Sequence, residues 1–119
     1  MGFSTRYRGN VLVVSLSGEL DHHSADELRQ AIEKELDKDI ARHILLDLSQ
    51  LVFMDSSGVG VLLGRYRRVL AQGGKMAAYA LHPHLKRLYE LAALSKVIPA
   101  FASESLAVHE LKKDEVLRR

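Results

Sequence analysis

Short apolar runs alternate along the chain with longer segments in which apolar residues recur every three or four positions. The run VLVVSL at 11–16 is rich in β-branched residues, which predicts a strand. A weaker run, FSTRYR at 3–8, precedes it, and Gly9 and Asn10 between the two favour a tight turn. These two segments are therefore predicted to pair as a β-hairpin.

Three further apolar runs predict strands. The nearly continuous run HILLDL at 43–48 is typical of a strand covered on both faces. Shorter runs follow at 75–81 (KMAAYAL) and 97–101 (VIPAF). We expect the last of these at an edge of the sheet, because Pro99 has no N–H group to donate.

The first helical pattern is expected at about 24–38. Ser24 and Glu27 have the spacing of a capping box, in which each side chain bonds the backbone N–H of the other residue. Leu28, Ile32 and Leu36 then recur at four-residue spacing, so that one apolar stripe faces the core and charged residues face water.

Three more helices follow in the sequence. The second is expected at about 56–72 and is stopped by the glycine pair at 73–74. The third begins at Pro83, a residue favoured at the first position of a helix. The fourth is expected at 103–117, where Ser103 can cap it.

The predicted order of elements is β-β-α-β-α-β-α-β-α. Strands that alternate with helices imply a mainly parallel sheet with right-handed crossovers, and the opening hairpin makes the sheet mixed. We therefore predict a single α/β domain over 1–119, with its core at about 3–111 and a charged tail at 112–119. The functional surface of such a sheet lies at the carboxyl ends of its strands, where the segments GELDHH and FMDSSG are expected.

Composition and charge exclude several classes of protein. The net charge is only +2, and much of the basic excess lies in the tail, which argues against a nucleic-acid partner. No apolar run approaches the ~20 residues that cross a membrane, and the first residues lack the apolar region of a signal peptide. The chain has no cysteine, which excludes disulfides and thiolate metal sites. We expect a cytoplasmic protein that binds neither nucleic acid nor membrane.

The segment FMDSSGVGVLLGRY at 53–66 joins a strand to a helix and permits three interpretations. A nucleophilic serine would need the pattern Gly-x-Ser-x-Gly, and neither Ser56 nor Ser57 has the leading glycine. A phosphate-binding loop would need Gly-Lys-Ser/Thr, which the chain lacks. The third interpretation is a helix start that receives a phosphate: Asp55 caps the helix, Ser56 is its first residue, and free amides and the helix dipole lie nearby.

A helical projection of 56–72 separates two faces. The face expected to pack on the core consists of Val59, Leu62, Leu63, Tyr66, Val69 and Leu70. The opposite face contains Ser57, Val61, Gly64 and Arg68, with Gly60 at its edge. On this projection Val61 is an exposed hydrophobic residue between glycines, and the flat surface would let another backbone approach.

The loop GELDHH supplies the other candidate residues. His22 and His23 lack the additional ligands that a metal site needs, so no metal site is predicted. Asp21 has two open interpretations. Its carboxylate could pair with a basic residue of a partner, or it could bond the backbone of its own turn.

The segments GELDHHSADEL, DLSQLVFMDSSGVGVLLGRY, GGKM and HLKRLYELAAL resemble the STAS domain of anti-sigma factor antagonists, and most of all those of the sporulation factor sigma-F. The similarity runs from about Val11 to Ser105. It implies a STAS fold and a regulatory protein that is not an enzyme and needs no cofactor.

The resemblance also implies a mechanism. The unphosphorylated protein would bind an anti-sigma factor that is also a serine kinase of the GHKL type and would thereby release the sigma factor. The kinase would phosphorylate Ser56 and inactivate the protein, and a serine phosphatase would reactivate it. The expected partner-binding residues are Asp21, His22, His23, Asp55, Ser57, Gly58, Gly60, Val61 and Gly64.

Two alternatives remain: the same module in the general-stress sigma-B pathway or a stressosome, and a module that binds a nucleotide or small molecule.

Overall fold

The structure is a computed structural model that describes residues 1–117. The last two residues of the predicted charged tail therefore lie outside the described residues. None of the helices in this range is long and apolar enough to cross a membrane.

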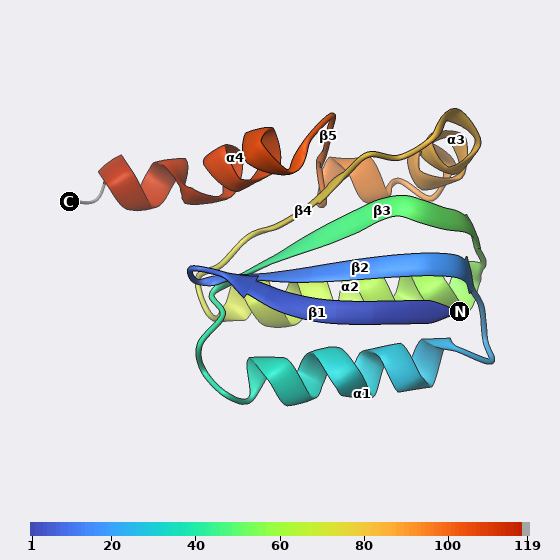
Figure 1. Cartoon of the computed structure of the whole chain (residues 1–119), viewed down its shortest axis with the longest axis horizontal. Coiled ribbons are helices and arrows are strands. Elements are labelled where there is room, and N and C mark those ends of the chain that lie inside the picture. The colour runs from blue at the N-terminus through green and yellow to red at the C-terminus, as the bar shows by residue number, and fades with distance from the viewer. Residues whose placement is uncertain (118–119) are drawn as a thin grey trace.

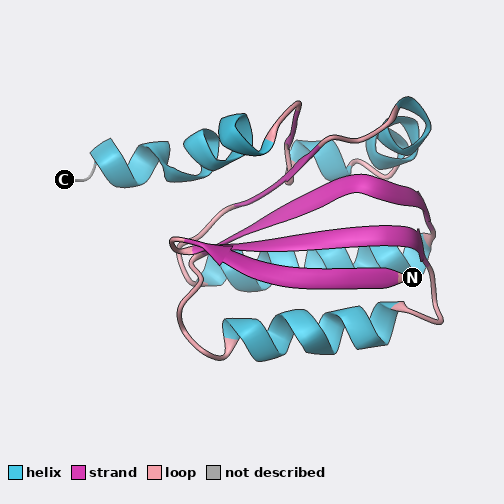
Figure 2. Cartoon of the chain, in the orientation of Figure 1, coloured by secondary structure: helices cyan, strands magenta, loops and turns pink. Residues whose placement is uncertain are grey.

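A five-stranded mixed sheet forms the centre of the molecule (Figures 1 and 2). Its strands are β1 (Gly2–Arg8), β2 (Val11–Leu20), β3 (His43–Met54), β4 (Met76–Tyr79) and β5 (Ala100–Phe101). They lie in the order β1-β2-β3-β4-β5, with β1 antiparallel to β2 and the other pairs parallel. Gly9 has a φ of 59°, the left-handed conformation that the tight turn after β1 requires. The predicted hairpin and the mixed, mostly parallel sheet are confirmed.

Four α-helices surround the sheet. They are α1 (Ala25–Leu36), α2 (Ser56–Ala71), α3 (Pro83–Leu91) and α4 (Glu104–Leu117), and a short 3₁₀ helix, η1 (Leu94–Lys96), follows α3. Helix α2 ends at the predicted glycine pair: Gly73 has a φ of 81°, and a Cβ on Gly74 would lie 1.8 Å from the carbonyl oxygen of Arg42. The predicted order of strands and helices is confirmed.

The two faces of the sheet have separate hydrophobic cores. The larger core joins one face of the sheet to α1, α2 and α3. The smaller core lies on the other face under α4 and includes Val11, Leu45 and Ala107. In Figure 1, α1 and α2 lie side by side, and α4 lies beyond β4, away from α1.

Strands β2 and β3 are longer than their apolar runs predicted. They pair in parallel until Leu20 lies opposite Met54, although Ser49 and Gln50 of β3 are exposed. Two shifts in register, one of them between Gly18 and Glu19, keep the strands paired over this length. As a result, both strands end at the same edge, where the candidate site lies.

Candidate functional site

The start of α2 has the predicted cap. Asp55 follows β3 in an extended conformation, and its Oδ1 accepts hydrogen bonds from the N–H groups of Ser57 at 2.9 Å and Gly58 at 3.1 Å. Ser56 is the first helical residue and is exposed. The sequence had suggested free amides at this helix start. The amides of Ser57 and Gly58 are not free, because the carboxylate of Asp55 already binds them.

The turn that connects β2 to α1 is built on Asp21. Its Oδ1 accepts hydrogen bonds from the N–H groups of His23 at 3.0 Å and Ser24 at 3.2 Å, and Ser24 Oγ accepts from the N–H of Asp21 at 3.1 Å. These bonds outweigh the effect of partial burial and lower the pKa of Asp21. The turn-forming interpretation of Asp21 is thus confirmed, while pairing with a partner stays a prediction.

The capping box at the start of α1 was predicted wrongly. Ser24 occupies the N-cap position, but its side chain makes no capping hydrogen bond and its backbone is helical instead of extended. The reason is competition within the turn, because the hydroxyl of Ser24 bonds to Asp21. The helix consequently runs over 25–36, two residues shorter at its end and one at its start than expected.

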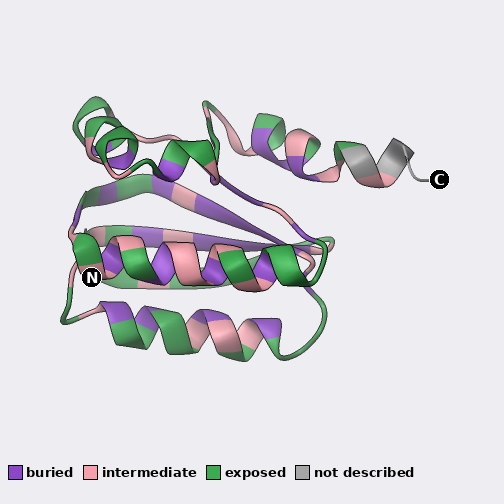
Figure 3. Ribbon diagram, turned by 180° about the vertical axis from the view of Figure 1, so that it is seen from behind, coloured by how far each residue is buried: buried purple, intermediate pink, exposed green. Residues whose placement is uncertain are grey.

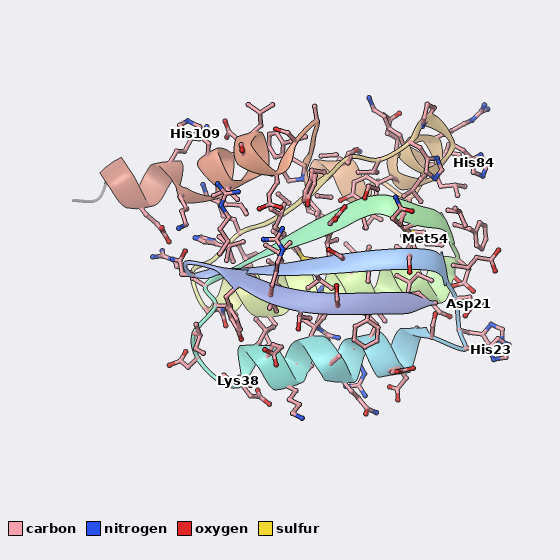
Figure 4. All side chains as sticks on the ribbon, viewed as in Figure 1. Asp21, His23, Lys38, Met54, His84 and His109 are labelled. Atoms are coloured by element: carbon pink, nitrogen blue, oxygen red, sulfur yellow. The ribbon has the colours of Figure 1, made fainter. Side chains whose placement is uncertain are left out.

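Asp55 also links the start of α2 to the loop that contains Asp21, His22 and His23. While its Oδ1 caps α2, its Oδ2 accepts a hydrogen bond from the N–H of His22 at 3.3 Å and lies 3.9 Å from His22 Nδ1. His22 and His23 are both exposed, with ring centroids 4.0 Å apart. Figure 4 shows Asp21 and His23 at the same end of the molecule as Met54. Within residues 1–117 no cluster of three or more potential ligands could hold a metal ion.

The predicted faces of α2 need correction. Val61 is 9% exposed and belongs to the larger core, so the prediction that it lies on the outer surface is wrong. Leu70 was expected in the core and is 56% exposed. The buried side of the helix contains Gly58, Val61, Leu62, Arg65 and Val69. Figure 3, in which α2 lies across the sheet with α1 beside it, shows these buried bands in purple.

Contacts between α1 and α2 explain why the buried face of α2 differs from the predicted one. Arg68 was placed on the outer face, but its guanidinium donates to Glu33 Oε2 and Asp37 Oδ1, each at 2.8 Å. Arg65 is 9% exposed, and its Nε lies 3.6 Å from Glu33 Oε2. Because α1 covers one side of α2 and the sheet covers another, the buried stripe is turned toward α1.

The three glycines of α2 have different roles. A Cβ on Gly58 would lie 2.7 Å from Leu20 Cγ and 2.8 Å from Leu20 O, whereas a Cβ on Gly60 or Gly64 would meet nothing within 4 Å. Gly58 therefore lets the end of β2 pack on α2 and, like Val61, lies beneath the surface that a partner could contact. The open surface at Gly60 and Gly64 is confirmed, and its contact with a partner stays a prediction.

A shallow apolar hollow beside Ser56 was missed in the sequence. It has a volume of about 390 Å³ and is lined by Met54, Asp55, Ser56, Val59, Leu88, Leu91 and Ala92. Three of these residues belong to α3 or its end, which no local pattern connects to Ser56. The available signal was the spacing of Leu88 and Leu91, which widens the apolar stripe of α3 beyond its buried residues, Leu85 and Tyr89.

His82 is held in a structural role, which weighs against a nucleophilic serine. Its Nδ1 accepts from the N–H of Leu85 at 3.2 Å and caps α3, and its Nε2 lies 2.9 Å from Leu51 O. With both ring nitrogens engaged, His82 is not available to take a proton from Ser56.

The geometry of the candidate site is thus an exposed serine at a capped helix start. A sequence profile of the STAS domain matches residues 3–107. The chain belongs to the STAS domain family.

Relatives of this STAS domain include regulators of two sigma factors. It is 43% identical over 106 residues to the anti-sigma F factor antagonist of Paenibacillus polymyxa, a match that covers 89% of this chain and 90% of the relative. It is 32% identical over 89 residues to the anti-sigma-B factor antagonist of Bacillus subtilis (strain 168), covering 75% and 80%. Among solved structures, the Bacillus cell fate determinant SpoIIAA in its phosphorylated form matches with a TM-score of 0.71 and 29% identity, covering 92% and 98%.

Proposed function

We propose that this STAS domain is an anti-sigma factor antagonist that is switched by phosphorylation of Ser56. In its unphosphorylated form it binds an anti-sigma factor that is also a serine kinase of the GHKL type, and the sigma factor is released. Phosphorylation ends this binding, and a serine phosphatase restores it. The protein acts in the cytoplasm as a kinase substrate and not as an enzyme.

One observation carries the proposal: Ser56 is exposed at the first position of a helix whose cap, Asp55, is already in place. A kinase can reach such a serine without unfolding the helix. The identity of 43% to an anti-sigma F factor antagonist supports the sigma-F pathway of sporulation, and the phosphorylated form of SpoIIAA supports the modification.

Electrostatics explains how the phosphate acts. Phosphorylation adds about 1.5 to 2 negative charges. Asp55 already accepts hydrogen bonds from the amides of Ser57 and Gly58. The phosphate therefore lies next to a carboxylate and not next to free hydrogen-bond donors. It also repels the phosphates of the nucleotide bound to the kinase. A loss of only ~3 kcal/mol of binding free energy weakens the complex about a hundredfold, so no large conformational change is needed.

The remaining contacts surround Ser56. The loop of Asp21, His22 and His23 is fixed to the start of α2 through Asp55, so both segments face a partner together. Asp21 can pair there with a basic residue, and the open backbone at Gly60 and Gly64 lets the partner approach α2 closely.

The test is phosphorylation of the purified protein by the purified anti-sigma factor of the sigma-F pathway with ATP, read by mass spectrometry. We expect one phosphate on the wild type and on Ser57→Ala, and none on Ser56→Ala. A phosphate on Ser56→Ala would show that the site assignment is wrong. Ser56→Asp should fold normally and bind the kinase poorly.

A second candidate is the general-stress sigma-B pathway, favoured by the relative from Bacillus subtilis. Binding to purified anti-sigma factors of the two pathways separates the candidates. A higher affinity for the sigma-B partner would replace the sigma-F assignment. Calorimetry with ATP and GTP in the same series tests the nucleotide-binding alternative, because docking to a kinase requires no ligand on the STAS domain itself.

A further inference from the structure

Leu91 is the most exposed large hydrophobic residue among those whose side chains the structure describes, with 76% of its area open to water. It lies in the last turn of α3 and borders the hollow beside Ser56. Leu88 and Val59 extend the apolar lining toward the core, where Val59 packs against the larger cluster. Exposed apolar side chains next to a hollow are typical of a surface that another molecule covers.

The hollow is continuous with the proposed docking site. Asp55 and Ser56 line the hollow themselves, so a kinase that reaches the Ser56 hydroxyl also covers Leu91. The carboxylate of Asp55 also accepts the N–H of His22 and so joins the hollow to the turn that Asp21 forms. A complementary partner therefore has an aliphatic side chain for the hollow and a basic side chain beside it.

We infer that the hollow between the start of α2 and the end of α3 is the anchor point of the anti-sigma factor, which inserts an aliphatic side chain against Leu91. This inference rests on the proposed function and adds the apolar half of the interface. Acidic residues and the phosphate decide when the partner binds, while the hollow supplies affinity that does not depend on charge. Truncating an apolar anchor in the middle of an interface typically weakens binding about tenfold or more.

Two variants test the anchor, with one control. Leu91→Ser removes the exposed leucine, and Ala92→Leu keeps it but fills the hollow. Leu106→Ser is the control, because Leu106 is also largely exposed, at 55%, but lies on α4. Affinities are measured by calorimetry with the purified sigma-F-pathway anti-sigma factor and ADP, and folding is checked by thermal melting.

We expect both hollow variants to bind about tenfold more weakly and the control to bind like the wild type. In phosphorylation assays the KM of both should rise by the same factor with an unchanged kcat, because an anchor contributes equally before and during phosphoryl transfer. The inference is overturned if Leu91→Ser or Ala92→Leu binds as tightly as the wild type, or if Leu106→Ser loses as much affinity.

The same experiment separates the two proposals. If the wild type binds the anti-sigma factor and Ser56 is phosphorylated while Leu91→Ser behaves normally, only the anchor is wrong. If the wild type neither binds nor is phosphorylated, the proposed function and the anchor both fail.

Discussion

Replacing each glycine of α2 by alanine tests how closely Leu20, at the end of β2, packs against the start of α2. The Cβ of Gly58→Ala would lie 2.7 Å from Leu20 Cγ and 2.8 Å from Leu20 O. An ordinary carbon contact is about 3.5 Å or more, so the side chain of Leu20 would have to move away from α2 by about 0.8 Å. Leu20 is fully buried and its carbonyl accepts a hydrogen bond from Asp55 N, so it cannot move freely.

The expected change in unfolding free energy follows from comparing Gly58→Ala with the same exchange at Gly60 and Gly64. Overpacking of this kind costs about 1–3 kcal/mol of unfolding free energy. Alanine instead of glycine stabilises a helix by up to ~1 kcal/mol, and at Gly60 and Gly64 nothing opposes this gain. Because all three variants make the same exchange, Gly58→Ala should be less stable than Gly60→Ala by about 1–3 kcal/mol.

Urea unfolding with linear extrapolation measures these differences, provided that the three variants show equal m-values. Gly60→Ala and Gly64→Ala should equal or exceed the wild type in stability. Any loss of affinity for the anti-sigma factor in these two then arises at the surface and not from unfolding. Equal stability of Gly58→Ala and Gly60→Ala would refute the close packing of Leu20 on α2.

Three further predictions concern charged side chains. Asp55→Ala should lose about 0.5–2 kcal/mol of unfolding free energy in urea titrations because the cap is removed, whereas Asp55→Ser should retain most of it. Asp21→Asn keeps the acceptor oxygen of the turn and should stay within about 0.5 kcal/mol of the wild type, yet bind the anti-sigma factor more weakly in calorimetry; unchanged binding would leave Asp21 with only its structural role. Hydrogen bonds from Arg6 and Arg8 outweigh partial burial and lower the pKa of Glu104 from 4.5 to about 2, so its contribution to stability is complete above about pH 4.5 and is lost as the pH falls toward 2. Glu104→Gln should therefore show a smaller drop in unfolding free energy over this range, and an identical drop would contradict the assignment.

The order of strands and helices could be predicted because the spacing of apolar residues within each segment indicates its secondary structure. The run at 11–16 and the stripe of Leu28, Ile32 and Leu36 are local signals, and the cap at Asp55 is local as well. The length of β3 was harder to predict, because strand pairing uses backbone groups and resumes after a register shift at the exposed residues Ser49 and Gln50.

The parts that failed depend on neighbours distant in sequence. The faces of α2 were assigned as if only the sheet covered the helix. In the structure α1 also packs against it: Glu33 and Asp37 bind Arg68, and Val61 belongs to the core that includes residues of α1. The hollow beside Ser56 needs Leu91, which lies far along the chain on α3. A projection of one helix contains no information on which other helix packs against it.

The antiparallel start of the sheet has a practical consequence for attaching anything to the protein. Because β1 runs against β2, Gly2 pairs with Ser17 near the carboxyl end of β2, and the first residues lie at the same end as Asp21 and His23 (Figures 1 and 4). Helix α4 instead extends toward the opposite end of the molecule. A fluorophore, affinity tag or fused domain joined ahead of Met1 would crowd the proposed phosphorylation site at Ser56, whereas one joined beyond α4 would leave it accessible.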